Sequence, residues 1–437
     1  MRINKIEIEN FKSFGQEVFD FRDVNVLIGA NASGKSNFIQ IFEFLKEIQK
    51  GDGIQKAVTN LGGIGDIINF NVDKKRASLK IEINPKPVTV KEAFELKNKR
   101  LVKNTDKIIY ELKLRDIGRN HFEFKEDLTF YQYFSINEFE DDEIGKEIQK
   151  HSKLFEYGIS KDYNGSFKFS EPKNSIENWL VIEGDEQTEF QLEFLTPFNL
   201  KIIEELNDRY IKRSIIEYGV SLIPSDLFDF GIYDINSKVL KETTNNSYET
   251  ELSKTGNNLP IIVKNILESD DAEQFIADVA GILDFIEDIK IVPFESLLDL
   301  RIKERYNKQE TKGRLISDGT VSAIAFIVAL YYQDNSIVFL EEPEHCLHPS
   351  LIDDVIRAAY DVAEFLDKQI VITTHSPDLL RHLKNLNDDL EDLVMISRDE
   401  ESGNSTLEKP VEKEMVKLFL EAELGIDELF IQNLLED

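Results

Sequence analysis

Residues 29–36 have the types and the spacing that phosphate binding requires. Their sequence, GANASGKS, fits the pattern G-x-x-x-x-G-K-[ST] at every fixed position. Gly29 and Gly34 let the backbone approach a phosphate closely, and the N–H groups at the start of a following helix attract anions. Lys35 would contact the β- and γ-phosphates of a nucleotide, and the Ser36 hydroxyl would bind Mg²⁺. The other residues that we expect at this site are Asn31, Ala32, Ser33 and Asn37.

Two adjacent carboxylates, Glu341 and Glu342, end an apolar run in the stretch SIVFLEEPEHCLHP, residues 336–349. A strand end that brings a carboxylate to a phosphate loop can hold Mg²⁺, and a second carboxylate can orient or deprotonate water. The alternatives are a solvated turn or a zinc site, although the spacing matches no standard zinc pattern. The residues that could form such a zinc site are Glu344, His345, Cys346 and His348.

Two further stretches contain polar groups that suit a phosphate site. His375 follows the apolar run QIVITT and could donate a hydrogen bond to a γ-phosphate oxygen or to an attacking water. A histidine at a strand end can also be purely structural. Ser317 and Gly319 stand at the start of an expected helix in RLISDGTVSAIAF, residues 314–326. That position makes an anion-binding cap or no more than a helix start.

These motifs need a framework that brings them together, and the apolar patterns predict a parallel α/β sheet. The N-terminal segment has the patterns of strands at 3–11 and 23–29 and of a helix at 34–50. Residues 315–376 then alternate helix, strand, helix and strand. Apolar strands of this kind form parallel sheets, and ligands bind at the carboxyl ends of their strands. The phosphate loop and the polar clusters that follow the later strands fall at these ends.

The remaining segments suggest additional subdomains. Short alternating strands separated by charged loops predict a mostly antiparallel β region from about residue 78 to 200. The next hundred residues are mainly helical in pattern, including 200–218. We find neither a fixed-period repeat nor a long heptad run. The expected divisions are an N-terminal lobe at 1–200, a helical or mixed insertion at 201–300 and a C-terminal lobe at 301–437.

Composition favours a globular cytoplasmic protein. The 437 residues are 41% hydrophobic and 31% charged, and no stretch approaches the roughly 18 apolar residues of a membrane helix. The N-terminus has the pattern of a strand, not of a signal peptide. Cys346 has no second cysteine to pair with, so an internal disulfide is excluded and a reducing compartment is expected.

The charge balance argues against extensive nucleic-acid binding. The formal net charge is -31 and the sequence pI is about 4.7, a poor match to a phosphate backbone and more simply a source of solubility. One exception is the stretch 301–314, which has six Lys or Arg and two Glu. This basic strip could meet DNA, RNA or an acidic partner, or it could be a solvated loop.

Taken in order, the motifs resemble the ABC-type ATPase heads of the SMC, RecF and OLD group. The resemblance implies a P-loop NTPase of mixed α/β class, with a mostly parallel core sheet, an antiparallel β subdomain and a helical subdomain. It covers most of the chain, but only the motifs are specific. The segments that carry the resemblance are IENFKSF, LIGANASGKSNF, LSKTGNNLP, LISDGT, FLEEPEHCLHP and ITTHSP.

The resemblance implies an enzyme that hydrolyses ATP to ADP and phosphate with Mg²⁺. If the roles of the matching family residues apply here, Glu341 helps to hold the metal, Glu342 is the general base and His375 senses the γ-phosphate. Glu341 departs from the aspartate of transporter-type heads, although OLD-like proteins often have glutamate there. Asp318 replaces a glycine of the transporters, which suits the non-transporter branch.

The resemblance also implies a homodimer or a higher homo-oligomer. In such heads Ser317 and Gly319 of one copy close on the γ-phosphate held by Lys35 of another, so that two ATP molecules are enclosed. His348 would lie in the loop that crosses the dimer seam. ATP would stabilise the closed pair, and hydrolysis would let it open.

The expected role is a switch for a separately encoded effector, of nuclease or Toprim type, in bacterial anti-phage defence. OLD nucleases have a Toprim domain after the head, and the roughly sixty residues that follow His375 are too few for one. The acidic DDLED run at 388–392 is better explained as a solvated loop than as a metal site. The alternative is a RecF-like ATPase that clamps DNA through the basic strip. A transporter subunit fits least, because the motifs differ from the transporter forms.

Overall fold

The computed structural model describes eleven segments of the chain, and the predicted helix at 200–218 lies outside them. Contacts divide the chain into two compact units, Met1–Asp20 with Glu43–Phe228 and Phe21–Phe42 with Asp229–Asp437. The division falls inside helix α1 (Lys35–Glu47). The described segments are 1–49, 53–73, 75–84, 94–96, 99–139, 147–163, 167–170, 227–294, 296–376, 379 and 391–409.

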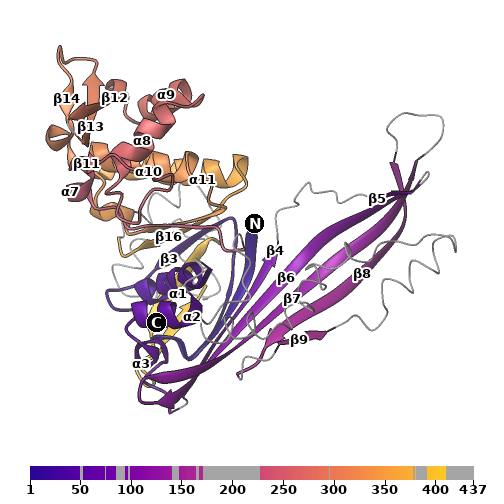
Figure 1. Cartoon of the computed structure of the whole chain (residues 1–437). Helices are drawn as coiled ribbons and strands as arrows, with labels where there is room; N and C mark the ends of the chain where they lie inside the picture. Colours follow the sequence, from indigo (N-terminus) through magenta and orange to yellow (C-terminus); the bar gives the residue numbers. More distant parts are fainter. Residues whose placement is uncertain are drawn as a thin grey trace, which may run out of the picture. The chain divides into compact units, whose positions relative to one another are not determined.

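The first unit is built around an eight-stranded antiparallel sheet with the order β2-β1-β4-β6-β7-β8-β9, with β5 paired to β6. Figure 1 shows β6, β7 and β8 as long neighbouring strands. This sheet confirms the antiparallel β region expected after residue 78. The strands are β1 (Arg2–Glu9), β2 (Gln16–Asp20), β4 (Arg76–Asn84), β5 (Phe94–Leu96), β6 (Lys99–Gly118), β7 (His121–Phe139), β8 (Glu147–Lys161) and β9 (Phe167–Ser170).

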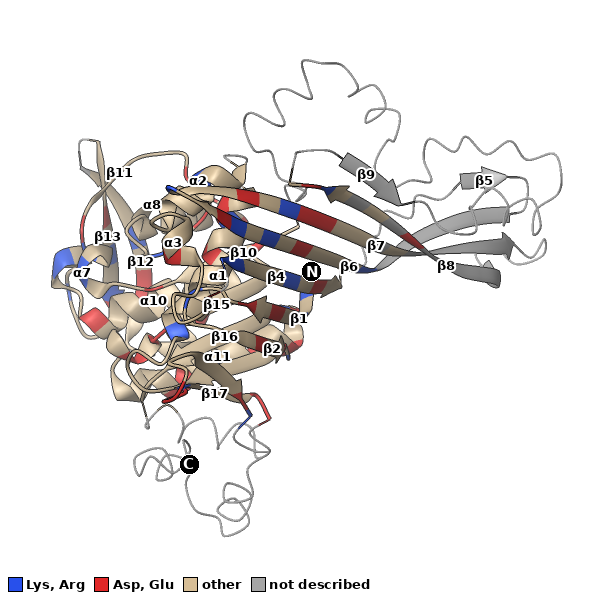
Figure 2. Cartoon of the chain, turned by 90° about the horizontal axis from the view of Figure 1, so that it is seen from below, with Lys and Arg blue, Asp and Glu red and all other residues tan. Residues whose placement is uncertain are grey.

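Alternating side chains give this sheet a buried face and a polar face. In β4 every second residue is buried, which follows from the period of two in a strand. Figure 2 shows Lys, Arg, Asp and Glu positions distributed along β4, β6 and β7. Two short helices, α2 (Gly53–Asn60) and α3 (Ile64–Ile67), belong to the same unit.

The second unit contains a six-stranded sheet with the order β10-β15-β16-β3-β17-β18. Its neighbouring strands are parallel except for the antiparallel pair β17 and β18. β3, β10 and β16 are buried along their whole length, as near-continuous apolar runs predict. The strands are β10 (Phe230–Tyr233), β15 (Ile337–Glu341), β16 (Gln369–Thr374), β3 (Val24–Ile28), β17 (Leu393–Arg398) and β18 (Ser405–Glu408).

Helices cover both faces of this parallel sheet. On one face Phe42 of α1 packs against Phe230 and Phe339, with ring centroids 5.6 and 4.6 Å apart. On the other face Val338 and Ile370 join a hydrophobic cluster with four helices. These helices are α8 (Leu259–Leu267), α9 (Ala272–Ile282), α10 (Asp318–Tyr331) and α11 (Pro349–Phe365), and Figure 1 shows α10 and α11 side by side. The expected fold class, mixed α/β with a mostly parallel core sheet and an antiparallel β subdomain, is confirmed.

Residues 227–294 differ from the mainly helical pattern expected there. Besides α8, α9 and α7 (Ser237–Leu240), they form β10 and two strands of a separate four-stranded antiparallel sheet, β11 (Thr244–Asn245) and β12 (Ile286–Phe294). β13 (Leu297–Glu304) and β14 (Thr311–Lys312) complete this sheet. β10 and β12 were missed because their apolar residues join the same core as the helices.

A membrane span was not expected from the sequence. In the part of the chain that the structure describes, no helix has both the length and the apolar character that a bilayer crossing requires.

Candidate active site

The loop between β3 and α1 follows a backbone path that few sequences allow. Ala32 and Gly34 have positive φ angles, 67° and 123°. Gly29 is buried, and a Cβ added there would collide with the carbonyl oxygen of Ile396 and lie 2.6 Å from Ser33 Oγ. Glycine is therefore required at position 29 by close backbone approach.

Lys35 is the first residue of α1, and its side chain is folded over the loop. Its Nζ donates hydrogen bonds to the carbonyl oxygens of Gly29 (2.7 Å) and Ala30 (3.1 Å). The residue is only 5% exposed. Burial lowers the pKa of the ammonium, and the nearby carboxylates Glu342 and Glu344 oppose this change.

The other predicted loop residues differ in exposure. Asn31, Ala32 and Ser36 are exposed, and Asn37 is half-buried. Ser33 is buried, with its main-chain oxygen accepting a 2.5 Å hydrogen bond from Ser405 Oγ. The Ser33 hydroxyl is buried without a hydrogen-bond partner. The loop therefore presents polar groups both at its surface and in its interior.

The two carboxylates at the end of β15 have different surroundings. Glu341 is the last residue of the strand, and its Oε1 lies 2.8 Å from Lys254 Nζ. Sequence reasoning missed Lys254 as part of the site, although it lies within the quoted segment LSKTGNNLP. Glu342 follows with a left-handed backbone, φ 41° and ψ 57°, and its N–H donates to the carbonyl oxygen of Thr373 at 3.0 Å. Because of this turn, the carboxylates of Glu341 and Glu342 lie close to different residues.

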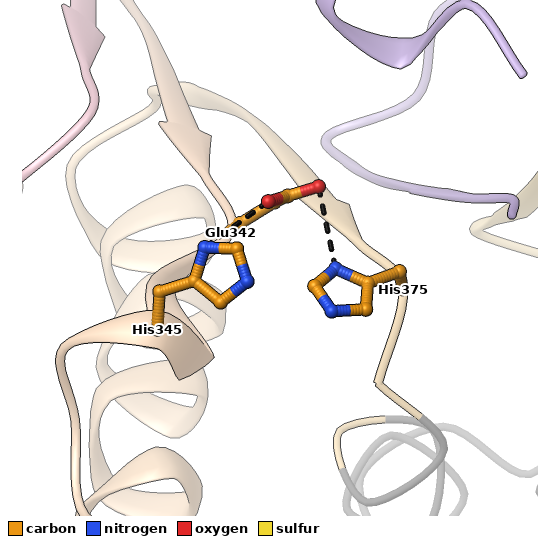
Figure 3. A group of neighbouring side chains, drawn as sticks. All are labelled: Glu342, His345 and His375. Atoms are coloured by element: carbon orange, nitrogen blue, oxygen red, sulfur yellow. Dashed lines mark ion pairs between the residues drawn. The ribbon is translucent and has the colours of Figure 1, made fainter. Parts of the chain in front are cut away.

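Glu342 lies between two histidines (Figure 3). Its Oε1 is 3.3 Å from Nδ1 of His375, and its Oε2 is 3.1 Å from Nδ1 of His345. The same Oε1 is 3.8 Å from Nζ of Lys35. His345 was considered from the sequence only as a zinc ligand, so its contact with Glu342 is new.

A buried carboxylate, Glu344, supports the loop that carries His375. Its Oε1 accepts hydrogen bonds from the Thr374 hydroxyl (2.6 Å) and from the His375 backbone N–H (3.1 Å). Only 7% of its side chain is exposed, and its Oε2 has no hydrogen-bond partner. Its pattern in the sequence, a third glutamate next to a proline, gave no sign of this role.

The strand order explains why these residues meet. β16 lies between β15 and β3 and is parallel to both, so the carboxyl ends of the three strands are neighbours. Lys35 follows β3, Glu342 follows β15 and His375 follows β16. The structure therefore brings together residues that are more than 300 positions apart in the sequence.

Ser317 and Gly319 lie elsewhere, at the start of α10. The Ser317 hydroxyl accepts a 3.1 Å hydrogen bond from Thr320 N–H and caps the helix, and Ser317 is exposed. A Cβ at Gly319 would be 3.4 Å from the backbone nitrogen of His348, which caps α11. Within the described residues no hydrogen bond or ion pair joins Ser317 or Gly319 to Lys35.

The four residues of the alternative zinc site are engaged separately. Cys346 donates from Sγ to the carbonyl oxygen of Pro343, and burial raises the pKa of its thiol to about 11. His348 Nδ1 lies 2.8 Å from the Ser350 hydroxyl. Glu344 binds Thr374, as described above. The fold therefore does not bring these four residues together as one set of metal ligands.

Two basic side chains of the strip at 301–314 lie close to acidic residues outside it. Arg301 lies 3.0 Å from Asp299, and Lys303 lies 4.0 Å from Glu287. The strip contains the second half of β13, the connection at 305–310 and all of β14. These two pairs offset part of the positive charge of the strip.

Comparison with known proteins identifies a family. Residues 24–381 match the family described as "AAA domain, putative AbiEii toxin, Type IV TA system". No protein of curated function matches the sequence significantly.

Three solved structures of SMC heads are similar to the chain. The SMC head bound to the C-winged helix domain of ScpA is 14% identical, with 93% of this chain and 97% of that chain covered and a TM-score of 0.47. The head domain from Thermotoga maritima is 14% identical (93% and 98% covered, TM-score 0.41). The head with an extended coiled coil from Pyrococcus furiosus, bound to the C-terminal domain of ScpA, is 13% identical (96% and 99% covered, TM-score 0.46).

Proposed function

The chain belongs to this family of AAA domains, and from that premise we propose that it binds and hydrolyses ATP as a molecular switch. One observation carries the proposal. Lys35 and His375 come from different elements, and both approach Oε1 of Glu342, at 3.8 and 3.3 Å. A cation, a carboxylate and an imidazole at the carboxyl edge of a parallel sheet supply what phosphoryl transfer to water requires.

Phosphate binding is assigned to the loop at 29–36. The Lys35 ammonium would exchange the carbonyl oxygens of Gly29 and Ala30 for phosphate oxygens. The start of α1 adds partial positive charge and backbone donors. The remaining proposed contacts are Asn31, Ala32, Ser33, Gly34, Ser36 and Asn37.

Hydrolysis is assigned to Glu342 and His375. Glu342 takes a proton from water as the water oxygen attacks the γ-phosphorus, and the bond to the bridging oxygen breaks with its electron pair leaving on ADP. His375 donates a hydrogen bond to the γ-phosphate or to the attacking water. The left-handed turn at Glu342 directs its carboxylate toward His375 and Lys35, which supports this division of roles.

Ser36 and Glu341 would hold Mg²⁺. The Ser36 hydroxyl is exposed in the first turn of α1, and the Glu341 carboxylate ends β15, so both have the chemistry of magnesium ligands. Bound Mg²⁺ neutralises charge on the phosphates. The Lys254 ammonium, 2.8 Å from Glu341 Oε1, competes with the metal for that oxygen.

Dimerisation is proposed because the helix cap at Ser317 faces solvent. Ser317 and Asp318 are exposed at the N-terminus of α10, where an anion is favoured. We propose that Ser317 and Gly319 of one copy close on the γ-phosphate held by Lys35 of a second copy. Each copy then completes the nucleotide site of the other.

The proposed partner is a separately encoded effector, of nuclease or Toprim type, in a cytoplasmic anti-phage defence system. The family description refers to a putative toxin and a Type IV TA system, which is in keeping with a defence role. The net charge of -31 would favour a partner with a basic surface. Co-purification with the product of the adjacent gene tests this step, and full biological effect of the ATPase alone would exclude it.

The central experiment measures ADP and phosphate release by the purified chain with Mg²⁺ and ATP. Lys35→Ala should lose ATP binding, because its ammonium is the nearest cation to the loop oxygens. Lys308→Ala, an exposed lysine between β13 and β14, is the matched control. Equal ATP affinity in Lys35→Ala and in the control would rule out the assigned phosphate site.

A further inference from the structure

We propose that Glu342, His345 and His375 form a binding site for a divalent transition metal of the Zn²⁺ class, and that metal bound there stops ATP hydrolysis. Their potential ligand atoms all lie within 4.8 Å of one another, and this is the cluster of His, Cys and acidic residues that emerges from the described chain. Figure 3 shows both imidazoles turned toward the same carboxylate.

The two separations between histidine nitrogen and carboxylate oxygen suit zinc. Nδ1 of His345 is 3.1 Å from one carboxylate oxygen of Glu342, and Nδ1 of His375 is 3.3 Å from the other. Zn–N and Zn–O bonds of about 2.0–2.1 Å in a tetrahedron place neighbouring ligand atoms about 3.3 Å apart. One carboxylate and two histidines also leave a fourth position for water, as in open zinc sites.

Backbone hydrogen bonds hold the three ligands in place before any metal arrives. The N–H of His345 donates to the carbonyl oxygen of Glu342 at 3.0 Å, within a short 3-10 turn (Pro343–His345). The N–H of Glu342 donates to the carbonyl oxygen of Thr373 in β16, two residues before His375. The ligands therefore share one rigid corner of the sheet, which lowers the cost of ordering them.

The local charge favours a cation, and the donor atoms favour a transition metal. Glu344 Oε1 lies 3.7 Å from Nδ1 of His375, so a second carboxylate borders the cluster. Nδ1 of His375 is buried and makes no hydrogen bond of good geometry. Imidazole nitrogen suits Zn²⁺, Cu²⁺ or Ni²⁺, whereas Mg²⁺ prefers oxygen ligands.

Lys35 competes with the metal for the same carboxylate. Its Nζ is the nearest described cation, 3.8 Å from Oε1 of Glu342. A metal ion must therefore overcome repulsion from this ammonium. Removing the charge should tighten metal binding, the opposite of its effect on ATP.

Metal binding would remove the two groups that hydrolysis uses. The lone pairs of Glu342 and Nδ1 of His375 would be committed to the ion, so Glu342 could not take a proton from water. This inhibitory consequence rests on the proposed ATPase function, whereas the metal site itself does not.

The binding experiment uses the full chain, stripped of metal with a chelator, without nucleotide, and titrated with Zn²⁺ in a calorimeter. We expect one Zn²⁺ per chain. His345→Ala should lower the affinity at least about tenfold, because it removes a ligand. His121→Ala, an exposed histidine on the first unit's sheet, is the matched control and should bind normally. Lys35→Ala should bind more tightly.

A spectroscopic measurement separates the site from unspecific binding. Co²⁺ added in place of Zn²⁺ should give the visible absorption of a four-coordinate ion, and His345→Ala should weaken that absorption. Absence of Zn²⁺ binding, or binding unchanged in His345→Ala, would overturn the metal site whatever the enzyme does.

The inhibition experiment compares ATP turnover with and without Zn²⁺ in the same variants. We expect Zn²⁺ to suppress turnover in the wild type and in His121→Ala. In His345→Ala, turnover with Zn²⁺ should be nearly equal to turnover without it. Equal suppression in His345→Ala would mean that Zn²⁺ acts through ATP, and the regulatory inference would fall. If the wild type turns over no ATP while Zn²⁺ still binds, the proposed function fails and the metal site stands.

Discussion

The two large sheets differ in how their charged side chains are arranged. On the antiparallel sheet, opposite charges on neighbouring strands form pairs, as in Lys80–Glu7 (3.0 Å) and Lys107–Glu82 (3.4 Å). On the parallel sheet, the polar groups gather at one edge, where Glu342 lies close to one lysine and two histidines. Paired charges across strands stabilise a sheet, whereas converging ones can do chemistry.

The two units also differ in whether their buried polar groups have hydrogen-bond partners. Among the described residues, four buried side-chain atoms lack a hydrogen-bond partner, all in the second unit, and three belong to the candidate site: Ser33 Oγ, Glu344 Oε2 and His375 Nδ1. In the first unit the fully buried Glu126 accepts a 2.9 Å hydrogen bond from Tyr110. Unsatisfied groups are costly to fold, so their concentration at one edge indicates a site kept for ligands.

The largest expected effect is on Glu342. Glu342→Gln keeps the shape but removes the proton acceptor, so turnover should fall about 10²- to 10⁴-fold while ATP binding remains. ATP-bound dimers should accumulate, which size-exclusion chromatography with ATP would detect. The matched control, Glu123→Gln on the charged face of the antiparallel sheet, should turn over normally. A normal hydrolysis rate in Glu342→Gln would remove the assignment of the base.

The second prediction tests whether the first unit's buried charges serve stability alone. Lys161 is 2% exposed, its Nζ lies 4.6 Å from the centre of the Phe124 ring, and burial lowers the pKa of its ammonium while Glu126 opposes the change. Lys161→Met leaves Glu126 buried without that charge and should lower the free energy of unfolding by about 3–5 kcal/mol.

Urea unfolding measures this loss, and Lys125→Met, a partly exposed lysine on the neighbouring strand, is the control. Turnover per folded chain should stay unchanged in both variants, because neither lysine belongs to the candidate site. A loss below about 1 kcal/mol in Lys161→Met would mean that the buried charge is better compensated than its surroundings indicate.

The third prediction concerns the loop backbone. Gly29→Ala forces a Cβ against the carbonyl oxygen of Ile396, so it should destabilise the chain by about 1–3 kcal/mol and weaken ATP binding. Gly281→Ala in α9 is the matched control, because a Cβ there meets nothing within 4 Å, and it should be neutral or stabilising. Thermal unfolding and nucleotide titration measure both variants. Equal behaviour of the two would contradict the close approach at Gly29.

Much of the parallel sheet could be predicted from the sequence because its signals are local. The apolar runs at 23–29, 336–344 and 369–377 contain β3, β15 and β16. The glycine pattern of the loop between β3 and α1 is compatible with one backbone conformation, so this loop could also be predicted. The polar residues at the strand ends then had to meet, since parallel neighbours share an edge.

The contacts within the site were less predictable because they depend on strand order and side-chain direction. Lys254 lies 87 residues before Glu341 and precedes a glycine turn, so its pairing has no local signal. The left-handed turn at Glu342 moves His345 toward Glu342 and away from the Cys346 and His348 with which it was grouped. Non-local packing decides such contacts.

The smallest expected effect lies on the charged face and tests whether its pairs matter at all. The hydrogen bond from Lys80 holds the pKa of the Glu7 carboxyl below its usual value, and both side chains are 39% exposed. Because such pairs are screened by water and salt, Lys80→Met should cost only about 0.2–1 kcal/mol near pH 7, with Lys308→Met as the exposed control.

The pH dependence fixes the sign of this last effect. A carboxyl whose pKa is lower in the folded state stabilises the fold above its unfolded pKa, near 4.3, and the stabilisation is lost as pH falls through the folded value. The difference between the wild type and Lys80→Met in urea unfolding should therefore vanish in acid and shrink in high salt. A difference that persists in acid would have to come from packing of the lysine stem instead of its charge.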